Sequence, residues 1–167
     1  MLKQEVIDAL NKQIKLEGDS SQLYLAMASW AETKGLEGTS SFLYSHADEE
    51  RTHMLKLIKF VNERGGKAFV PQIEEPAQDF DSIKDVFSAI LKHEIFVSES
   101  INDIVFLTLE HKDFPTHNFL QWFVSEQIEE ERLARTVLDK LEMIGNDKGG
   151  LYLFDRDIVS MDVTGAE

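Results

Sequence analysis

Four long segments of this chain repeat apolar side chains at intervals of three and four residues. That spacing places the apolar side chains along one side of an α-helix, so it predicts amphipathic helices. The segments run over residues 3–34, 39–64, 82–111 and 116–144. The pattern therefore predicts an all-α chain with four long helices.

The links between these segments predict how the helices are connected. Residues 35–38 (GLEG) and 112–115 (KDFP) are short, and each makes its neighbours an antiparallel hairpin. Residues 65–81 lack helical periodicity. Fully extended, this connection reaches about 50 Å, which is more than the length of about 39 Å of the second helix. This connection can cross the bundle from end to end and make the second and third helices parallel. A short fifth helix is expected over about residues 151–163.

Composition narrows the class of protein. The chain has no cysteine, which excludes a disulfide scaffold, thiolate metal sites and cysteine catalysis. Its net charge is −14, which repels nucleic acid and anionic membranes and attracts cations. No segment resembles a signal peptide or approaches the roughly 18 apolar residues that span a bilayer. We expect a cytoplasmic protein without nucleic-acid or membrane partners.

Each apolar stripe is interrupted near its middle by polar side chains with ligand atoms. Measured from the two hairpin turns, the interruptions in the first and third helices lie about 20 residues before the turn, and those in the second and fourth about 15 after it. Four carboxylates should therefore converge at one level inside the bundle. The interrupting residues, helix by helix, are Glu17; Glu50 and His53; Glu94; Gln127 and Glu130.

Buried carboxylates require compensation. An unpaired buried charge costs several kcal/mol or shifts its pKa until the group is neutral. The stripes contain no lysine or arginine, so the pattern predicts a pair of divalent metal ions, and the imidazole favours iron, manganese or zinc over magnesium. For any single glutamate, the alternative is a solvated side chain at a misjudged helical register.

Three motifs are similar to those of bacterial non-haem ferritins: EERTH (49–53), DFPTHNFLQWFVSEQIEEE (113–131) and GLYLFD (150–155). The resemblance covers essentially the whole chain. It implies a ferritin-like four-helix bundle within a single domain over residues 1–167. It also implies iron storage with ferroxidase activity, in which iron reacts with dioxygen or hydrogen peroxide, and a homo-oligomeric cage of 24 subunits around an Fe(III) mineral. No haem is expected, because Thr52 stands where bacterioferritins have a methionine.

The resemblance also implies roles for individual residues. Tyr24 corresponds to a tyrosine near the metal pair and Trp122 to a nearby tryptophan, both as electron donors during oxygen reduction. Ordinary core packing is the alternative for both, and the favoured one for Trp122. The implied ligands are Glu17, Glu50 (bridging) and His53 for a first iron; Glu94 and Glu130, with Gln127 close by, for a second; and Glu49, Glu126 and Glu129, assisted by Glu130, for a third.

The chain departs from relatives that repeat Glu-x-x-His in the fourth helix. Gln127 and Glu130 take those positions, so the second iron should be held less tightly. A looser second site suits a protein that oxidises iron and passes it on. Gly18 is a second departure: it either loosens the backbone around Glu17, leaves space for iron to reach the site, or reflects drift at the surface.

The remaining histidines have open interpretations. His46 lies on the second stripe, one turn before Glu50, and is either an outer or transient iron ligand or, as we favour, a buried histidine with ordinary partners. His93, His111 and His117 are expected at the surface or in turns.

Three other functions compete with iron storage. A DNA-protecting mini-ferritin places its iron between subunits and usually has basic tails, whereas these tails are acidic. A rubrerythrin-like peroxidase usually has a second Glu-x-x-His and a cysteine iron domain. A metal-free helical interaction protein would bind no iron.

Overall fold

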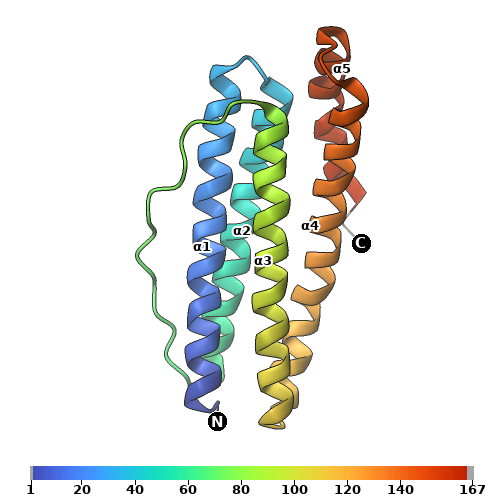
Figure 1. The fold of residues 1–167 in the computed structure, drawn as a ribbon. Helices are drawn as coiled ribbons and strands as arrows, with labels where there is room; N and C mark the ends of the chain where they lie inside the picture. Colours follow the sequence, from blue (N-terminus) through green and yellow to red (C-terminus); the bar gives the residue numbers. More distant parts are fainter. Residues whose placement is uncertain (1, 165–167) are drawn as a thin grey trace.

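The computed structural model describes residues 2–164 and is a four-helix bundle with a short C-terminal extension (Figure 1). No strand occurs in this range, so the predicted all-α class is confirmed. The extent of the domain, expected over residues 1–167, stays a prediction. The helices are α1 (Gln4–Thr33), α2 (Glu37–Glu63), α3 (Ile83–Glu110), α4 (Phe114–Ile144) and α5 (Lys148–Ile158), followed by the 3₁₀ helix η1 (Val159–Thr164).

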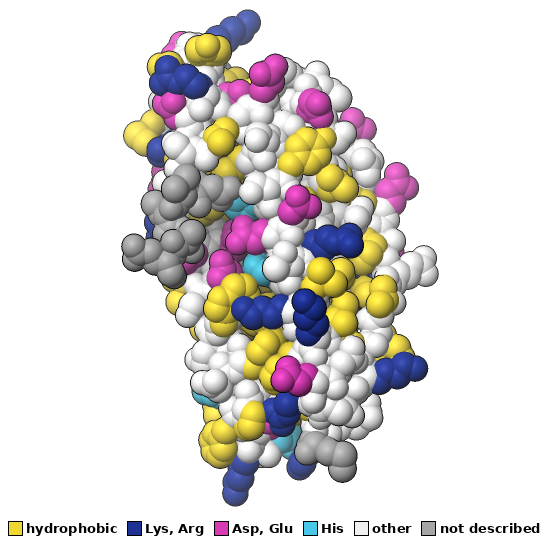
Figure 2. Space-filling model, turned by 180° about the vertical axis from the view of Figure 1, so that it is seen from behind, with side chains coloured by type: hydrophobic (Ala, Val, Ile, Leu, Met, Phe, Trp, Pro, Cys, Tyr) yellow, Lys and Arg dark blue, Asp and Glu magenta, His cyan; other side chains and the backbone are white. Residues whose placement is uncertain are grey.

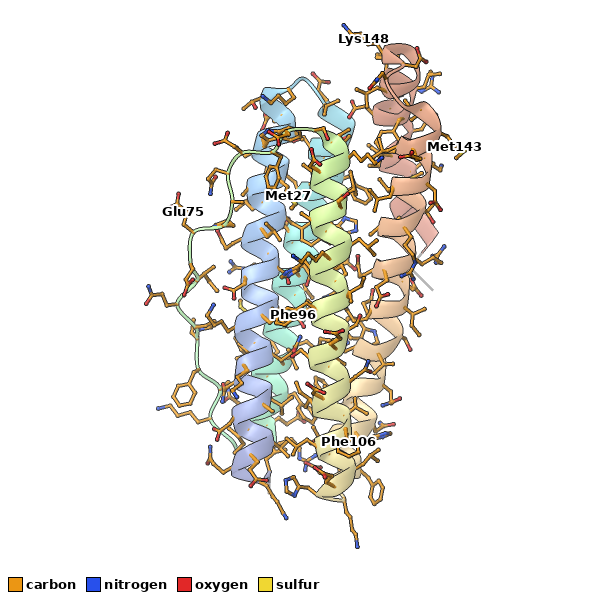
Figure 3. All side chains as sticks on the ribbon, in the orientation of Figure 1. Met27, Glu75, Phe96, Phe106, Met143 and Lys148 are labelled. Carbon is orange, nitrogen blue, oxygen red and sulfur yellow. The ribbon has the colours of Figure 1, made fainter. Side chains whose placement is uncertain are left out.

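The connection between α2 and α3 runs the length of the bundle along the outside of α1 (Figure 1). Asn11 of α1 holds its first part: the Asn11 amide donates to the Lys67 carbonyl at 3.1 Å, and the Phe69 N–H donates to Asn11 at 2.8 Å. The side chain of Glu75 points away from the bundle (Figure 3). As the sequence predicts, this crossing makes α2 and α3 parallel.

Aspartate and serine side chains set three of the helix starts. Ser82 accepts a hydrogen bond from the Asp85 N–H, which caps α3. Asp113 caps α4, which therefore begins at Phe114, two residues before the expected start. Asp147 accepts from the Gly150 N–H at 2.7 Å, so α5 begins at Lys148, three residues earlier than expected.

The start of α2 is capped from α5. Leu36, at the N-cap position, has no side-chain acceptor, and Asp155 replaces one by accepting from the Gly38 N–H at 3.1 Å and the Thr39 N–H at 2.8 Å. The sequence placed Gly38 in the link over residues 35–38, but the structure places it inside α2. A Cβ there would lie 1.7 Å from the Asp155 carbonyl oxygen, so only glycine allows α5 to approach this closely.

The apolar core forms two clusters, one toward each end of the bundle. The first includes Met27, whose side chain points between the helices (Figure 3), together with Leu43 and Phe87; the second includes Leu10 and Ile101. A layer of buried polar side chains lies between them, as the interrupted stripes predict. Within residues 2–164, no helix is long and apolar enough to cross a bilayer.

Candidate metal centre

The polar layer draws side chains from all four long helices. On the face shown in Figure 2, acidic and histidine side chains gather at mid-height of the molecule. All six interrupting residues of the stripes are at most 7% exposed: Glu17, Glu50, His53, Glu94, Gln127 and Glu130.

The α1–α2 half of the layer consists of Glu17, Glu50 and His53. Ligand atoms of these three residues all lie within 4.8 Å of one another. His53 Nδ1 is 3.2 Å from Glu50 Oε2 and 3.8 Å from Glu17 Oε2. Glu17 Oε2 is buried and has no hydrogen-bond partner. An orphaned buried carboxylate oxygen facing an imidazole and a second carboxylate is a ready-made ligand for a cation.

Burial and mutual repulsion change the acidity of this half. Burial raises the pKa of Glu17 well above 4.5, and the negative charge of Glu50 raises it further. Burial likewise raises the pKa of Glu50, with the charge of Glu94 as the next cause. Without a cation, both groups therefore hold their protons to a higher pH than a solvated glutamate does. A divalent ion would reverse that preference.

The α3–α4 half is arranged around Glu94. The Tyr24 hydroxyl donates to Glu94 Oε1 at 2.8 Å, and the Gln127 amide donates to Glu94 Oε2 at 3.0 Å and to the Glu94 carbonyl at 3.2 Å. Glu130 Oε2 lies 3.8 Å from His46 Nε2. Burial raises the pKa of Tyr24, as do the charges of Glu94 and Glu130. Tyr24 is therefore a neutral donor that orients Glu94.

Two further groups extend from the buried pair toward solvent. Glu49 and Glu126 come within 4.8 Å of His53, and Glu49 also groups with His46 and Glu130. Both glutamates are partly exposed. Burial raises the pKa of Glu126, and Glu49 and Glu129 raise it further against the opposing influence of His53. Glu129 is exposed and belongs to neither group, and its role in a third site stays a prediction.

Comparison with known proteins assigns the chain to a family. The family model for the ferritin-like domain matches residues 7–144. The chain belongs to the ferritin-like family.

Individual relatives span nearly the whole length. A probable bacterial non-heme ferritin-like protein of Haemophilus influenzae and a bacterial non-heme ferritin of Campylobacter jejuni are each 46% identical to it over 158 residues, 95% of this chain, covering 96% and 95% of the relatives. An open-pore ferritin of the archaeon Archaeoglobus fulgidus superposes with a TM-score of 0.93 at 39% identity, covering 95% of this chain and 98% of that one.

This ferritin-like chain holds Glu17 through a residue that the sequence reasoning missed. Gln13 is fully buried, donates to Glu17 Oε1 at 2.7 Å and accepts from the Ser100 hydroxyl at 2.6 Å. Gln13 lies one helical turn before Glu17, and that polar residue at i−4 on the buried side of the helix was the available signal. It fixes one carboxylate oxygen and leaves the other facing the centre of the layer.

Two residues around the site have neighbours that the sequence did not indicate. His93 is half-buried, and its Nε2 lies 2.7 Å from the Ser20 hydroxyl oxygen of α1. Gly18 is neither surface drift nor open space for iron. It is buried, and a Cβ there would lie 2.7 Å from Ile73 Cδ1 and 3.1 Å from Met54 Sδ. The glycine lets the crossing connection pack against α1.

Trp122 is not buried in the core, the position that the sequence favoured. It is 38% exposed, its ring meets His53 edge-on at 5.2 Å between centroids, and Lys56 Nζ lies 3.1 Å from its ring centroid. Trp122 and Lys56 therefore form a partly exposed rim beside His53. His111 ends α3 as its C-cap, in agreement with the expected turn position.

Proposed function

We propose that this ferritin-like chain stores iron by oxidising Fe(II) with dioxygen at a paired site inside the bundle. The observation that carries the proposal is the buried carboxylate layer with its orphaned Glu17 Oε2. Among the described side chains of residues 2–161, none of the buried ones is a lysine or arginine that could neutralise this layer. Cations bound from solution supply the missing charge.

The side chains suggest how the two iron ions are held as substrate. Glu17, Glu50 and His53 bind the first, Glu94 and Glu130 bind the second, and Glu50 bridges them. Carboxylates with one imidazole suit Fe(II) and become better ligands as its charge increases to Fe(III). Tyr24 and Gln127 orient Glu94 through the hydrogen bonds to its two oxygens.

The reaction is a two-electron reduction of dioxygen. Each Fe(II) gives up one electron, and dioxygen takes both electrons and two protons to form hydrogen peroxide. Glu49, Glu126 and Glu129 provide a third position, through which Fe(III) leaves toward the mineral. All proposed ligands belong to one chain, which favours this reading over a mini-ferritin with iron held between subunits.

We also propose that copies of the chain assemble into a homo-oligomeric cage of 24 subunits. Large apolar side chains remain exposed on the single chain, including Val70 (82%) on the crossing connection and Tyr152 (71%) on α5. These side chains would be covered by contacts between subunits in such a cage. The cytoplasmic location expected from the sequence stays a prediction.

Anaerobic loading followed by a pulse of oxygen tests the proposal. We expect the metal-free protein to bind several Fe(II) per chain and then to consume oxygen rapidly as Fe(III) absorbance appears. Glu126→Ala and Glu129→Ala should change the ratio of oxygen consumed to iron oxidised. Glu99→Ala is the matched control, since Glu99 is an exposed glutamate of α3. Absence of Fe(II) binding in the wild-type protein would refute the proposed function.

A further inference from the structure

A small pocket lies between α3 and α4, beside the Glu94 half of the candidate metal centre. Its volume is about 100 Å³. One water molecule takes roughly 30 Å³ in the liquid, so the pocket has room for a molecule larger than water. Its lining combines three apolar side chains with four polar ones, which suits a small polar ligand.

The pocket extends from the surface to Gln127. At its mouth, Asn102 and Ile128 are exposed, whereas Ile101 and Gln127 are buried and form its inner end. The Gln127 amide donates to Glu94 Oε2 at 3.0 Å and to the Glu94 carbonyl at 3.2 Å. Gln127 is therefore the wall between the pocket and Glu94. A molecule at the inner end lies one side chain away from the proposed ligands of the second iron.

The carboxylate in the wall of the pocket already has partners for both of its oxygens. Glu131 Oε1 accepts from the Ser98 hydroxyl at 2.7 Å, and Oε2 accepts from Arg135 at 2.8 Å. A cation entering the pocket would have to compete with these donors. An anion would meet the negative charge of Glu131 and of a chain whose net charge is −14. The lining therefore favours a small uncharged molecule.

The polar side chains of the lining favour hydrogen peroxide over dioxygen. The pocket is lined by the amides of Asn102 and Gln127 and by the hydroxyl of Ser98. Each of these groups can both donate and accept hydrogen bonds. Hydrogen peroxide carries O–H donors and acceptor oxygens, so it can replace water without losing those hydrogen bonds. Dioxygen has no donor, and displacing ordered water without replacing its hydrogen bonds weakens binding.

We propose that this pocket binds hydrogen peroxide and admits it to the Glu94 half of the metal centre. The inference deepens the proposed function and rests on it, because hydrogen peroxide is the product of the proposed reduction of dioxygen. A metal ion at Glu94 competes with the Gln127 amide for Oε2, so filling this half releases the wall of the pocket. The peroxide then takes one electron from each of two Fe(II) ions together with two protons, its O–O bond breaks, and two water molecules form.

The dependence of the oxidation rate on peroxide concentration tests the pocket. Protein loaded anaerobically with Fe(II) is mixed in a stopped-flow instrument with hydrogen peroxide or with dissolved dioxygen. Asn102→Leu keeps the size of the side chain and removes its amide. We expect the peroxide concentration at half-maximal rate to rise about two- to tenfold, the effect of losing one hydrogen bond. The maximal rate with peroxide and the initial rate with dioxygen should remain those of the wild-type protein.

A second variant fills the pocket. Val124→Phe adds a ring from α4, and we expect it to slow oxidation by peroxide more than Asn102→Leu does, with Fe(II) binding and the initial rate with dioxygen unchanged. Asn118→Leu, at an exposed asparagine of α4 outside the pocket, is the matched control for the lost amide. Val105→Phe, at a partly buried valine of α3, is the control for the added ring. Both controls should keep the peroxide dependence of the wild-type protein.

The outcomes separate this inference from the proposed function. Absence of Fe(II) binding in the wild-type protein overturns the proposed function and the peroxide pocket together. Normal Fe(II) binding with an unchanged peroxide dependence in Asn102→Leu overturns the pocket alone. Equal slowing with peroxide and with dioxygen overturns the assignment of peroxide as its ligand. Asn102 is exposed, so Asn102→Leu keeps the test decisive even if Val124→Phe fails to fold.

Discussion

The α1–α2 half of the metal centre and the α3–α4 half use the same i, i+3 spacing with different side chains. In α2 the pair is Glu50 and His53; in α4 it is Gln127 and Glu130. His53 Nδ1 faces two carboxylate oxygens, whereas the Gln127 amide donates to Glu94. Similar hairpins therefore create one half in which Glu17 Oε2 has no hydrogen-bond partner and another in which both oxygens of Glu94 accept hydrogen bonds.

The hydrogen bonds to Glu17 of α1 and to Glu94 of α3 reinforce this difference. Gln13 occupies one oxygen of Glu17 and leaves Oε2 without a partner. Tyr24 and Gln127 occupy both oxygens of Glu94. A metal at Glu17 gains a ligand without breaking a hydrogen bond, while a metal at Glu94 competes with existing donors. The α1–α2 half should therefore bind iron more tightly, and the other half should exchange it.

Removing the open carboxylate should have the largest effect. Glu17→Ala eliminates the orphaned oxygen, and we expect rapid iron oxidation to fall on the order of 100-fold or more, as losing a metal ligand should cost at least what losing an outer partner does. The measurement is stopped-flow absorbance of Fe(III), with circular dichroism to confirm that the helices persist. Glu110→Ala, at an exposed glutamate of α3, should react like wild type. Unchanged oxidation in Glu17→Ala would refute its assignment.

Making the two halves alike should have the next largest effect. The double variant Gln127→Glu, Glu130→His gives α4 the Glu-x-x-His arrangement of α2 and removes the amide that donates to Glu94. We expect Co(II) to bind the α3–α4 half about tenfold more tightly, and iron to stay there after oxidation. Calorimetric titration and the time course of mineral formation provide the measurements. Equal affinity in the variant and wild type would show that the helix backbone, not these side chains, makes the halves unequal.

The smallest effect concerns stability and pH. Glu17 and Glu50 have pKa values in the folded chain that are raised above 4.5, the ordinary pKa of a glutamate in the unfolded chain. Their contribution to the free energy of unfolding is therefore fully present below pH 4.5 and is lost as the pH rises through the raised pKa values. Zn(II) displaces these protons, and the increase in Tm that it causes should therefore grow with pH. For a chain of this size, 1 kcal/mol corresponds to about 2–4 °C.

Calorimetry of the metal-free and zinc-loaded protein at several pH values checks this dependence. Glu17→Gln, which cannot ionise, should flatten it. A zinc-induced shift that is the same at every pH in the wild-type protein would mean that the two carboxylates are already ionised before the metal binds.

Local patterns in the sequence predict much of this structure. The spacing of apolar residues placed the four helices within two residues of their observed ends, since burying one side of a helix repeats at a fixed interval. The same register put Glu17 and Glu94 inside, and both are buried. For the site, the sequence predicted which carboxylates meet, because helix length converts residue number into depth.

Contacts between distant segments could not be predicted in this way. Gly18 and Gly38 were interpreted through local preference alone, whereas the structure explains them by the approach of Ile73 and Asp155. His93 is half-buried because Ser20 on another helix faces it. The hydrogen bonds that distinguish Glu17 from Glu94 likewise depend on side-chain rotamers, which periodicity does not specify.

Because Asp155 caps the first turn of α2, the C-terminal segment acts at a part of the bundle that lies away from the candidate metal centre. A chain truncated after Gly150 loses the acceptor for Gly38 and Thr39, and α2 would unwind from its first turn. That turn lies roughly 16 Å along the helix axis from Glu50. The C-terminal segment therefore stabilises one end of the bundle, and its removal should leave the proposed iron ligands in place.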